Sequence, residues 1–88
     1  MKQIRKYSLL NKNDKQFVMP KGSEILTVQR QKDDICVWAL VDLEEEVLVS
    51  RSFIIYGTGE NINENFQHSY LATVQFDGYV YHVFELIS

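Results

Sequence analysis

The chain has 88 residues and a net charge of −3, with 45% hydrophobic and 12% aromatic residues. This length fits a single domain spanning residues 1–88, and the composition excludes a disordered chain. Because a negative chain repels a polyanion over most of its surface, the charge also argues against non-specific binding to duplex DNA.

The apolar segments are short. The longest apolar run covers residues 35–41, far fewer than the ~20 residues that a helix needs to cross a bilayer. No apolar core of a signal peptide lies near the N-terminus. The lone Cys36 lies inside this run, where a thiol behaves as a small buried hydrophobe. We therefore expect a protein of the reducing cytoplasm without membrane contact.

The first part of the chain alternates apolar and polar residues with the period of β-strands. Strands are predicted at residues 4–9 and 16–19, separated by the turn-forming segment NKND at residues 11–14. The segment MPKG follows. Its composition predicts Pro20 at the second position of a turn and Gly22 at the exit of that turn.

The next two strands, at residues 24–32 and 35–42, are predicted to pair as an antiparallel hairpin. The second of them is apolar on both faces. One face belongs to the predicted core, and the other carries Cys36, Trp38 and Leu40. Such a strand is either central in its sheet or covered by a partner subunit.

Two registers fit this hairpin. A turn at residues 32–33 sets Val28 opposite Val37, whereas a turn one residue later sets Val28 opposite Ala39. Both registers keep Leu26 and Val28 on the same core face, because they differ by two residues along the partner strand.

An arginine interrupts the apolar face of the following strand. The apolar residues of that face are Val47, Val49, Phe53 and Ile55, and Arg51 falls in the middle of the row. One interpretation is a strand bend or bulge from which the side chain reaches out to water. The other is an arginine held in a cleft to bind an anion.

The segment FIIYGTGE ends this strand with Gly57 and Gly59. A phosphate-binding fingerprint needs a further glycine or a lysine and the start of a long helix, and none of these follows. The pair therefore predicts a strand end with glycines at positive φ. A smaller site stays open, in which the Thr58 hydroxyl and neighbouring N–H groups receive one anionic oxygen.

The end of the chain predicts a tight hairpin. Asp77 and Gly78 lie between two alternating segments, the strongest short-range signal for a two-residue turn. This turn pairs Thr73 with His82, Leu71 with Phe84, and Tyr70 with Glu85.

Taken together, the periodicity predicts an all-β fold with at most one short helical turn. That turn would lie in the segment NINENFQHS, residues 61–69, with Ile62 and Phe66 facing inward and His68 in a loop. About seven strands in a series of hairpins must form a small antiparallel barrel or sandwich, since a flat sheet would leave an apolar face wet and its edges unpaired.

No residue pattern predicts catalysis. His68 and His82 are the only histidines, and neither has a second ligand at a zinc-binding spacing. No serine lies in a nucleophile elbow, and no pair of acids has a spacing that suggests acid–base work. We therefore expect no enzyme activity, no cofactor and no metal.

A small anionic nucleotide is the ligand that the remaining residues suit, because bases stack on aromatic rings and a guanidinium binds their oxygens. The residues expected to contact it are Arg51, Tyr56, Thr58 and His82. A domain of this size, filled by its own core, has little room for a cavity of about 300–1,000 Å³. We therefore expect a homo-oligomer with the ligand between its subunits.

Four segments of the chain, MPKGSEILTVQRQ, CVWALVD, FIIYGTGE and LATVQFDGYVYHVFE, resemble a widespread family of small proteins of no established activity, encoded mainly by phages and prophages. The resemblance implies an accessory protein in the cytoplasm of the host cell. The leading hypothesis is a counter-defence sponge that sequesters a nucleotide-derived immune signal. The alternatives are a direct inhibitor of a host defence nuclease, acting through the acids at residues 44–46, and a structural or assembly component.

Overall fold

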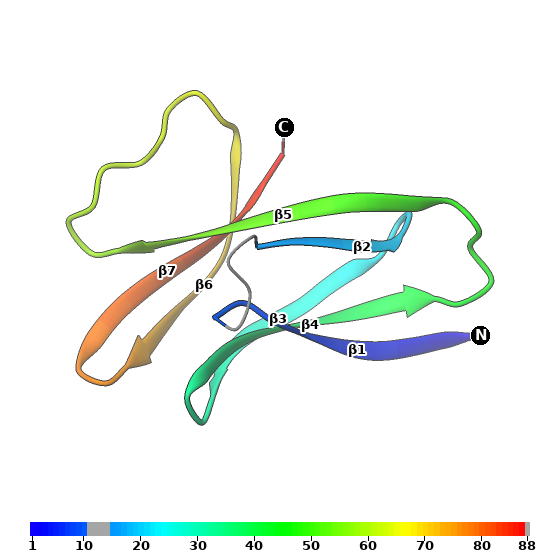
Figure 1. Ribbon diagram of the computed structural model, residues 1–88, viewed down its shortest axis with the longest axis horizontal. Helices are drawn as coiled ribbons and strands as arrows, with labels where there is room; N and C mark the ends of the chain where they lie inside the picture. The colour runs from blue at the N-terminus through cyan, green and yellow to red at the C-terminus, as the bar shows by residue number, and fades with distance from the viewer. Residues whose placement is uncertain (11–14, 88) are drawn as a thin grey trace.

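The computed structural model describes residues 1–10 and 15–87, and the described residues form strands and turns without a helix (Figure 1). The strands are β1 (Lys2–Ser8), β2 (Gln16–Pro20), β3 (Glu24–Gln31), β4 (Asp34–Asp42), β5 (Leu48–Gly57), β6 (His68–Phe76) and β7 (Tyr79–Leu86). The prediction of an all-β fold with about seven strands is confirmed. The turn expected at residues 11–14 lies outside the described residues.

The strands form two antiparallel sheets packed as a sandwich. One sheet has the order β1-β4-β3 and the other the order β2-β5-β7-β6. Among the described strands, only β3–β4 and β6–β7 are hairpins of consecutive strands, so the expected series of hairpins is wrong. The chain instead passes from one sheet to the other, which lets each sheet cover the apolar face of its partner. The buried core contains Leu9, Met19, Val28, Ile35, Val37, Phe53, Val74 and Val83.

The strand that is apolar on both faces lies in the centre of its sheet, between β1 and β3. Its inward residues Val37, Ala39 and Val41 are fully buried. On its other face Cys36 is fully buried too, while Trp38 is half-buried. Burial, together with the charge of Asp34, raises the pKa of the Cys36 thiol, which fits the expected role as a small hydrophobe.

The β3–β4 hairpin turns at residues 32–33, with Val28 opposite Val37. This is the first of the two predicted registers. A bulge between Ile25 and Thr27 then sets Ile25 opposite Ala39. Leu26 is 45% exposed as a result, so its predicted place on the core face is wrong. The extra residue of a bulge reverses the faces of the residues beyond it.

The β6–β7 hairpin turns at Asp77 and Gly78, as predicted, and both residues have positive φ, 49° and 84°. The predicted pairing holds from the turn up to Ala72 opposite Val83, and it includes Thr73 opposite His82. A bulge at Leu71 then sets Tyr70 opposite Phe84. The predicted pairings of Leu71 with Phe84 and of Tyr70 with Glu85 are therefore wrong.

The turn after β2 starts one residue later than predicted, at Pro20 instead of Met19. The Ser23 N–H donates to the Pro20 carbonyl oxygen at 3.1 Å, so Pro20 is the first residue of the turn. Gly22 is the third, with a φ of 82°, the value that a type II turn requires there. Pro20 is tolerated at the end of β2 because β2 is an edge strand.

Residues 58–67 form a loop and contain no helix. Ile62 and Phe66 are 48% and 44% exposed, so the prediction that they face inward on a helical turn is wrong. His68 is the first residue of β6 rather than part of this loop. Among the described residues, no helix is long and apolar enough to cross a membrane.

Candidate functional site

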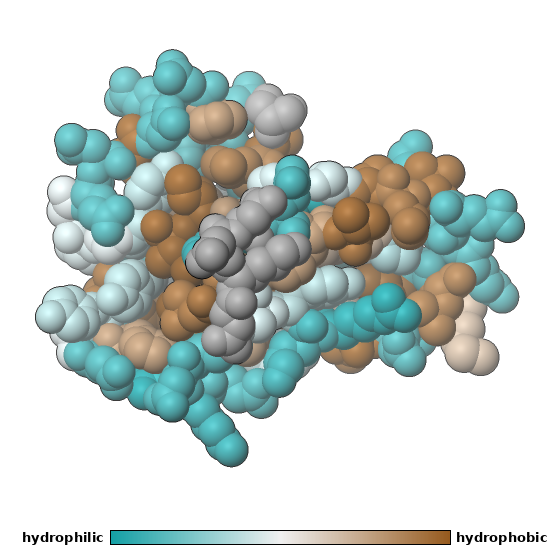
Figure 2. Space-filling model, viewed as in Figure 1, coloured by the Kyte–Doolittle hydropathy of each residue, from teal (hydrophilic) through white to brown (hydrophobic). Residues whose placement is uncertain are grey.

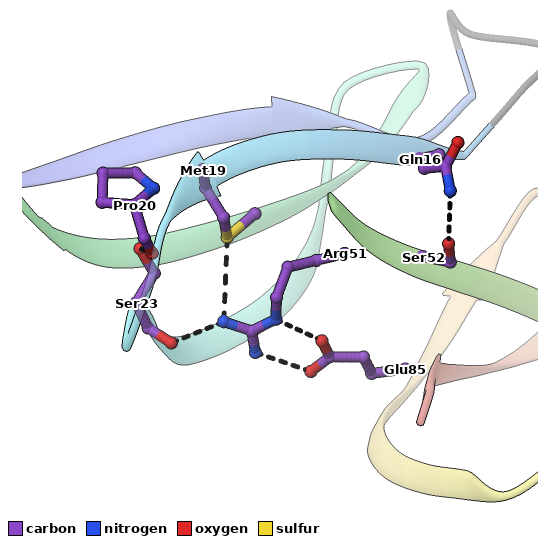
Figure 3. A network of polar contacts seen from close by, with 7 residues as sticks. All are labelled: Gln16, Met19, Pro20, Ser23, Arg51, Ser52 and Glu85. Atoms are coloured by element: carbon purple, nitrogen blue, oxygen red, sulfur yellow. Dashed lines mark hydrogen bonds and ion pairs between the residues drawn. The ribbon is translucent and has the colours of Figure 1, made fainter. Parts of the chain in front are cut away.

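Arg51 lies between the two sheets and binds an anion of its own chain (Figure 3). Its Nε–H and Nη2–H donate to the two carboxylate oxygens of Glu85 on β7, with an Nη2–Oε1 distance of 2.8 Å. Its Nη1–H donates to the Ser23 carbonyl oxygen at 2.6 Å. The side chains of Arg51 and Glu85 are only 20% and 14% exposed. The guanidinium therefore neither extends into water nor lies unpaired in an open cleft, so both interpretations from the sequence are wrong.

This ion pair connects β5, β7 and the turn that precedes β3. The hydrogen bonds that Arg51 donates to Glu85 outweigh the effect of burial and raise the pKa of Arg51, so the guanidinium stays charged. Arg51 and Tyr56 are five residues apart, about 16 Å along an extended strand, and point to opposite faces of β5. Arg51 is therefore separated from the other three residues predicted to contact a ligand.

Tyr56, Thr58 and His82 do come together. They line a hollow of about 210 Å³ on the outer face of the four-stranded sheet, with residues 57–60, Ile62 and Phe84. The Thr58 Oγ1 lies 2.8 Å from the His82 Nε2. Tyr56 itself is only 6% exposed, and its ring packs edge-on against Phe84 at 5.9 Å between centroids. Tyr56 is therefore a wall of the hollow rather than a platform for stacking.

His68 is a site residue that the sequence did not indicate. The Tyr56 hydroxyl accepts a hydrogen bond from the Asn63 N–H at 3.1 Å and lies 3.0 Å from the His68 Nε2. These contacts fasten the loop after β5 onto the outer face of the sheet. The sequence would indicate a role for His68 only if β6 were predicted to begin before Tyr70. His68 then pairs with Leu86 of β7 and lies in the sheet.

A row of hydroxyl groups and one imidazole crosses this outer face. Thr58 contacts the His82 Nε2 at 2.8 Å, and Thr73 contacts the His82 Nδ1 at 3.0 Å. The Tyr70 hydroxyl then lies 2.6 Å from the Thr73 Oγ1. Each hydroxyl can donate or accept, so the row can adapt to the donors and acceptors of a ligand.

The outer hollow continues past the point where β5 leaves the sheet. The last backbone hydrogen bond there joins the Thr58 N–H to the Val80 carbonyl oxygen at 3.3 Å. Beyond it lies a hollow of about 440 Å³ lined by residues 57, 58, 60 and 78–81. A third hollow of about 360 Å³, lined by Arg30 and residues 75–80, shares residues 78–80 with the second. We call these three adjoining hollows the tip groove.

Tyr79 lies where the second and third hollows meet. It is 67% exposed, and its ring centroid is 6.3 Å from that of Tyr81. At the end of the tip groove, the Arg30 guanidinium lies over the Phe76 ring, 4.5 Å from its centroid. Arg30 belongs to the other sheet, and Figure 1 shows the tips of the β3–β4 and β6–β7 hairpins on the same side of the molecule.

The glycine pair marks the end of a strand, as expected. Gly57 is the last residue of β5, and Gly59 has a φ of 94°. Gly57 itself has no positive φ, so that part of the prediction holds for Gly59 alone. The described residues contain no group of three or more metal-ligating side chains.

The acidic residues 44–46 lie in the turn between β4 and β5. Glu44 and Glu46 are exposed, and the N-terminal amine of Met1 lies 3.2 Å from the Glu44 carboxylate. A positive charge therefore already faces part of this acidic turn.

The chain belongs to a family described as a domain of unknown function, DUF7352, whose model matches residues 1–88. No curated protein and no solved structure matches the chain significantly. The family carries no assigned activity, so a functional proposal depends on the chemistry of the tip groove.

Proposed function

We propose that the protein is a non-enzymatic, phage-type accessory protein that sequesters a nucleotide-derived immune signal in the cytoplasm of its host. The ligand lies in the tip groove and is enclosed by a second copy of the chain. The proposal combines the chemistry of the tip groove with the resemblance to phage-encoded proteins.

The observation that carries this proposal is an exposed tyrosine at a hollow that Thr58 also lines. Tyr79 is 67% exposed, and no strand of the described chain covers its ring. Flat heterocycles stack on such rings, and each stacked base contributes roughly 1–3 kcal/mol. Thr58 and His82 line the adjoining parts of the tip groove. They can bond to the polar edges of a base or to sugar hydroxyls.

The surroundings of His82 favour binding over catalysis. A histidine that activates a hydroxyl nucleophile is oriented by a third group, typically a carboxylate, which stabilises the imidazolium as it forms. Here the third group is the hydroxyl of Thr73, 3.0 Å from the Nδ1. A neutral hydroxyl stabilises an imidazolium weakly, so Thr58 and His82 suit hydrogen bonding to a ligand that is not turned over.

Self-association follows from the affinity that a sponge requires. Holding a ligand without turnover at nanomolar strength takes about −12 kcal/mol, which an open surface groove rarely delivers. Ile62, which lines the tip groove, and Tyr70 are 48% and 58% exposed and supply apolar surface for a second copy. Figure 2 shows a further apolar area over the far ends of β2 and β5, where Val18 and Leu48 are exposed.

The proposal is tested by calorimetric titration of the purified protein with cyclic di- and trinucleotides and with ADP-ribose derivatives. We expect one of these ligands to bind, and Tyr79→Ala to weaken its binding about tenfold or more through lost stacking. Phe66→Ala removes an exposed ring that lies outside the tip groove, so it should leave the affinity unchanged.

No heat with any of these ligands at micromolar concentration would contradict the proposal. So would the capture of a stoichiometric host nuclease that is lost on reversing the charges of residues 44–46. That result would favour direct inhibition of a host defence protein. Co-purification with virions would point instead to a structural or assembly component.

A further inference from the structure

We propose that Arg30 is the anion-binding group of the tip groove, and that a ligand phosphate takes the place of Asp77 on its guanidinium. The identity of the ligand rests on the function proposed above, whereas the binding of an anion at Arg30 can be tested with an inorganic probe.

The guanidinium of Arg30 is already held in place. It lies over the Phe76 ring at 4.5 Å, and its Nε–H donates to the Lys32 carbonyl oxygen at 2.8 Å. One contact comes from the β6–β7 hairpin and the other from the β3–β4 turn. An arginine that is ordered before binding loses less conformational entropy when it takes an anion.

Most of its hydrogen-bond donors are still available. A guanidinium has five N–H donors, of which Arg30 uses one for Lys32 and one for Asp77. The other three have no acceptor among the described residues. The side chain is 39% exposed and lines the hollow of about 360 Å³. A planar fork of free donors matches the oxygens of a phosphate group.

Asp77 is a weak competitor for these donors. It offers one oxygen at 3.2 Å to the Arg30 Nη2, and its side chain is 65% exposed. Exposed pairs of this kind contribute little, because water screens them and both side chains must be ordered. A phosphate carries more charge and more acceptor oxygens than this single contact uses, so it can displace the carboxylate.

The position of Arg30 also predicts how the ligand is oriented along the tip groove. Tyr79 lies between the hollow of Arg30 and the hollow of Thr58. A phosphate on Arg30 therefore places an adjoining heterocycle against the Tyr79 ring and the rest of the molecule toward Thr58. The chemistry selects a compound with a phosphate or pyrophosphate group next to a flat heterocycle.

The test is a titration of ¹⁵N-labelled protein with inorganic pyrophosphate, followed by NMR. We expect saturable shifts in the amide signals of residues 75–80 and at Arg30. Arg30→Gln should weaken binding about tenfold or more, because a charge-assisted pair is lost. Asp77→Asn should strengthen binding roughly fivefold, because it removes a competing charge at close range. Asn accepts the positive φ of position 77, so the turn is kept.

Two matched variants separate a specific site from general charge effects. Asp33→Asn removes the same charge from the neighbouring hairpin tip without touching Arg30, and Arg5→Gln removes an exposed arginine of β1. Both should change the affinity less than about twofold, since exposed charges at a distance are screened. Arg30→Lys keeps the charge but loses the planar fork, so it should bind more weakly than wild type and more tightly than Arg30→Gln.

Wild-type affinity in a folded Arg30→Gln variant would overturn the inference, as would equal effects of Asp77→Asn and Asp33→Asn. The amide spectrum of each variant reports whether it is folded. If Arg30→Gln binds a nucleotide as tightly as wild type, this inference falls and the proposed function stands. If pyrophosphate binds at Arg30 and no nucleotide-derived compound binds at all, the proposed function falls and the anion site stands.

Discussion

Two arginines of this protein have the same kinds of partner and opposite surroundings. Arg51 binds both oxygens of Glu85 and a backbone carbonyl, and its side chain is 20% exposed. Arg30 binds one oxygen of Asp77 and a backbone carbonyl, and its side chain is 39% exposed. The donors of Arg51 are thus occupied by groups of the protein in a mostly buried place, which makes it the closed pair. Arg30 keeps free N–H donors beside a hollow, which makes it the open pair. Arg51 is thus fully paired with a carboxylate of its own chain, whereas Arg30 keeps N–H donors that a ligand anion can occupy.

The largest effect expected from this comparison is at the closed pair. Glu85→Gln leaves the Arg51 guanidinium without its counter-charge in a mostly buried position. Breaking such a pair from one side should lower the free energy of unfolding by about 3 kcal/mol. Urea denaturation measures the loss.

A double variant sharpens this prediction. Arg51→Met combined with Glu85→Leu removes both charges, so it should recover most of the stability lost in Glu85→Gln. If Glu85→Gln lowers the free energy of unfolding by less than about 1 kcal/mol, the Arg51–Glu85 pair stabilises the fold no more than the exposed Arg30–Asp77 pair. The difference proposed between the two arginines would then be wrong.

A carboxylate satisfied by its own chain should have a smaller effect. Asp34 accepts hydrogen bonds from the Ser8 hydroxyl at 2.5 Å and from the backbone N–H groups of Leu10 and Ile35. Burial alone would raise the pKa of Asp34, but these hydrogen bonds together hold it below its ordinary value of 3.8. The charged form therefore stabilises the fold above the ordinary pKa, and this contribution is lost as the pH falls through the lower folded-state pKa.

Asp34→Asn should therefore reduce the free energy of unfolding by about 1–2 kcal/mol at pH 7 and by less near pH 2. Urea denaturation at the two pH values measures the difference between variant and wild type. Asp33→Asn is the matched control for the change in charge, because Asp33 is exposed. An equal loss at both pH values would mean that the charge of Asp34 does not stabilise the fold.

The smallest effect on stability is expected at the open pair. Arg30→Gln should lower the free energy of unfolding by less than about 1 kcal/mol, because the pair with Asp77 is exposed. Thermal unfolding of Arg30→Gln beside Glu85→Gln tests the comparison directly. A loss at Arg30 as large as that at Glu85 would assign Arg30 a structural role.

The sequence indicates the fold well where its signals are local. Alternation predicts the strands, and Asp77 with Gly78 predicts the turn and the pairing of Thr73 with His82. The apolar residues on both faces of β4 predict either a central position or cover by a partner subunit, and β4 is central in its sheet. These features depend on neighbours along the chain or on one hairpin, which is why periodicity and turn chemistry reveal them.

The failures have a different physical origin. The bulges at Leu26 and Leu71 shift the register by one residue, because the sheets must curve and pack together. Arg51 finds its partner 34 residues away and Arg30 finds its partner 47 residues away. No local pattern encodes either distance. Knowing that β5 pairs with β7 would have placed Arg51 and Glu85 on one face, and knowing how the two sheets pack would have placed Arg30 beside Phe76.

Arg51 is occupied by groups of its own chain, and Arg30 is available to a ligand. The most direct test of this claim follows the Nε–H signals of the arginine side chains during a titration with inorganic pyrophosphate. The signal of Arg30 should shift and saturate, while that of Arg51 stays in place. A shift at Arg51, or no shift at Arg30, would contradict the claim.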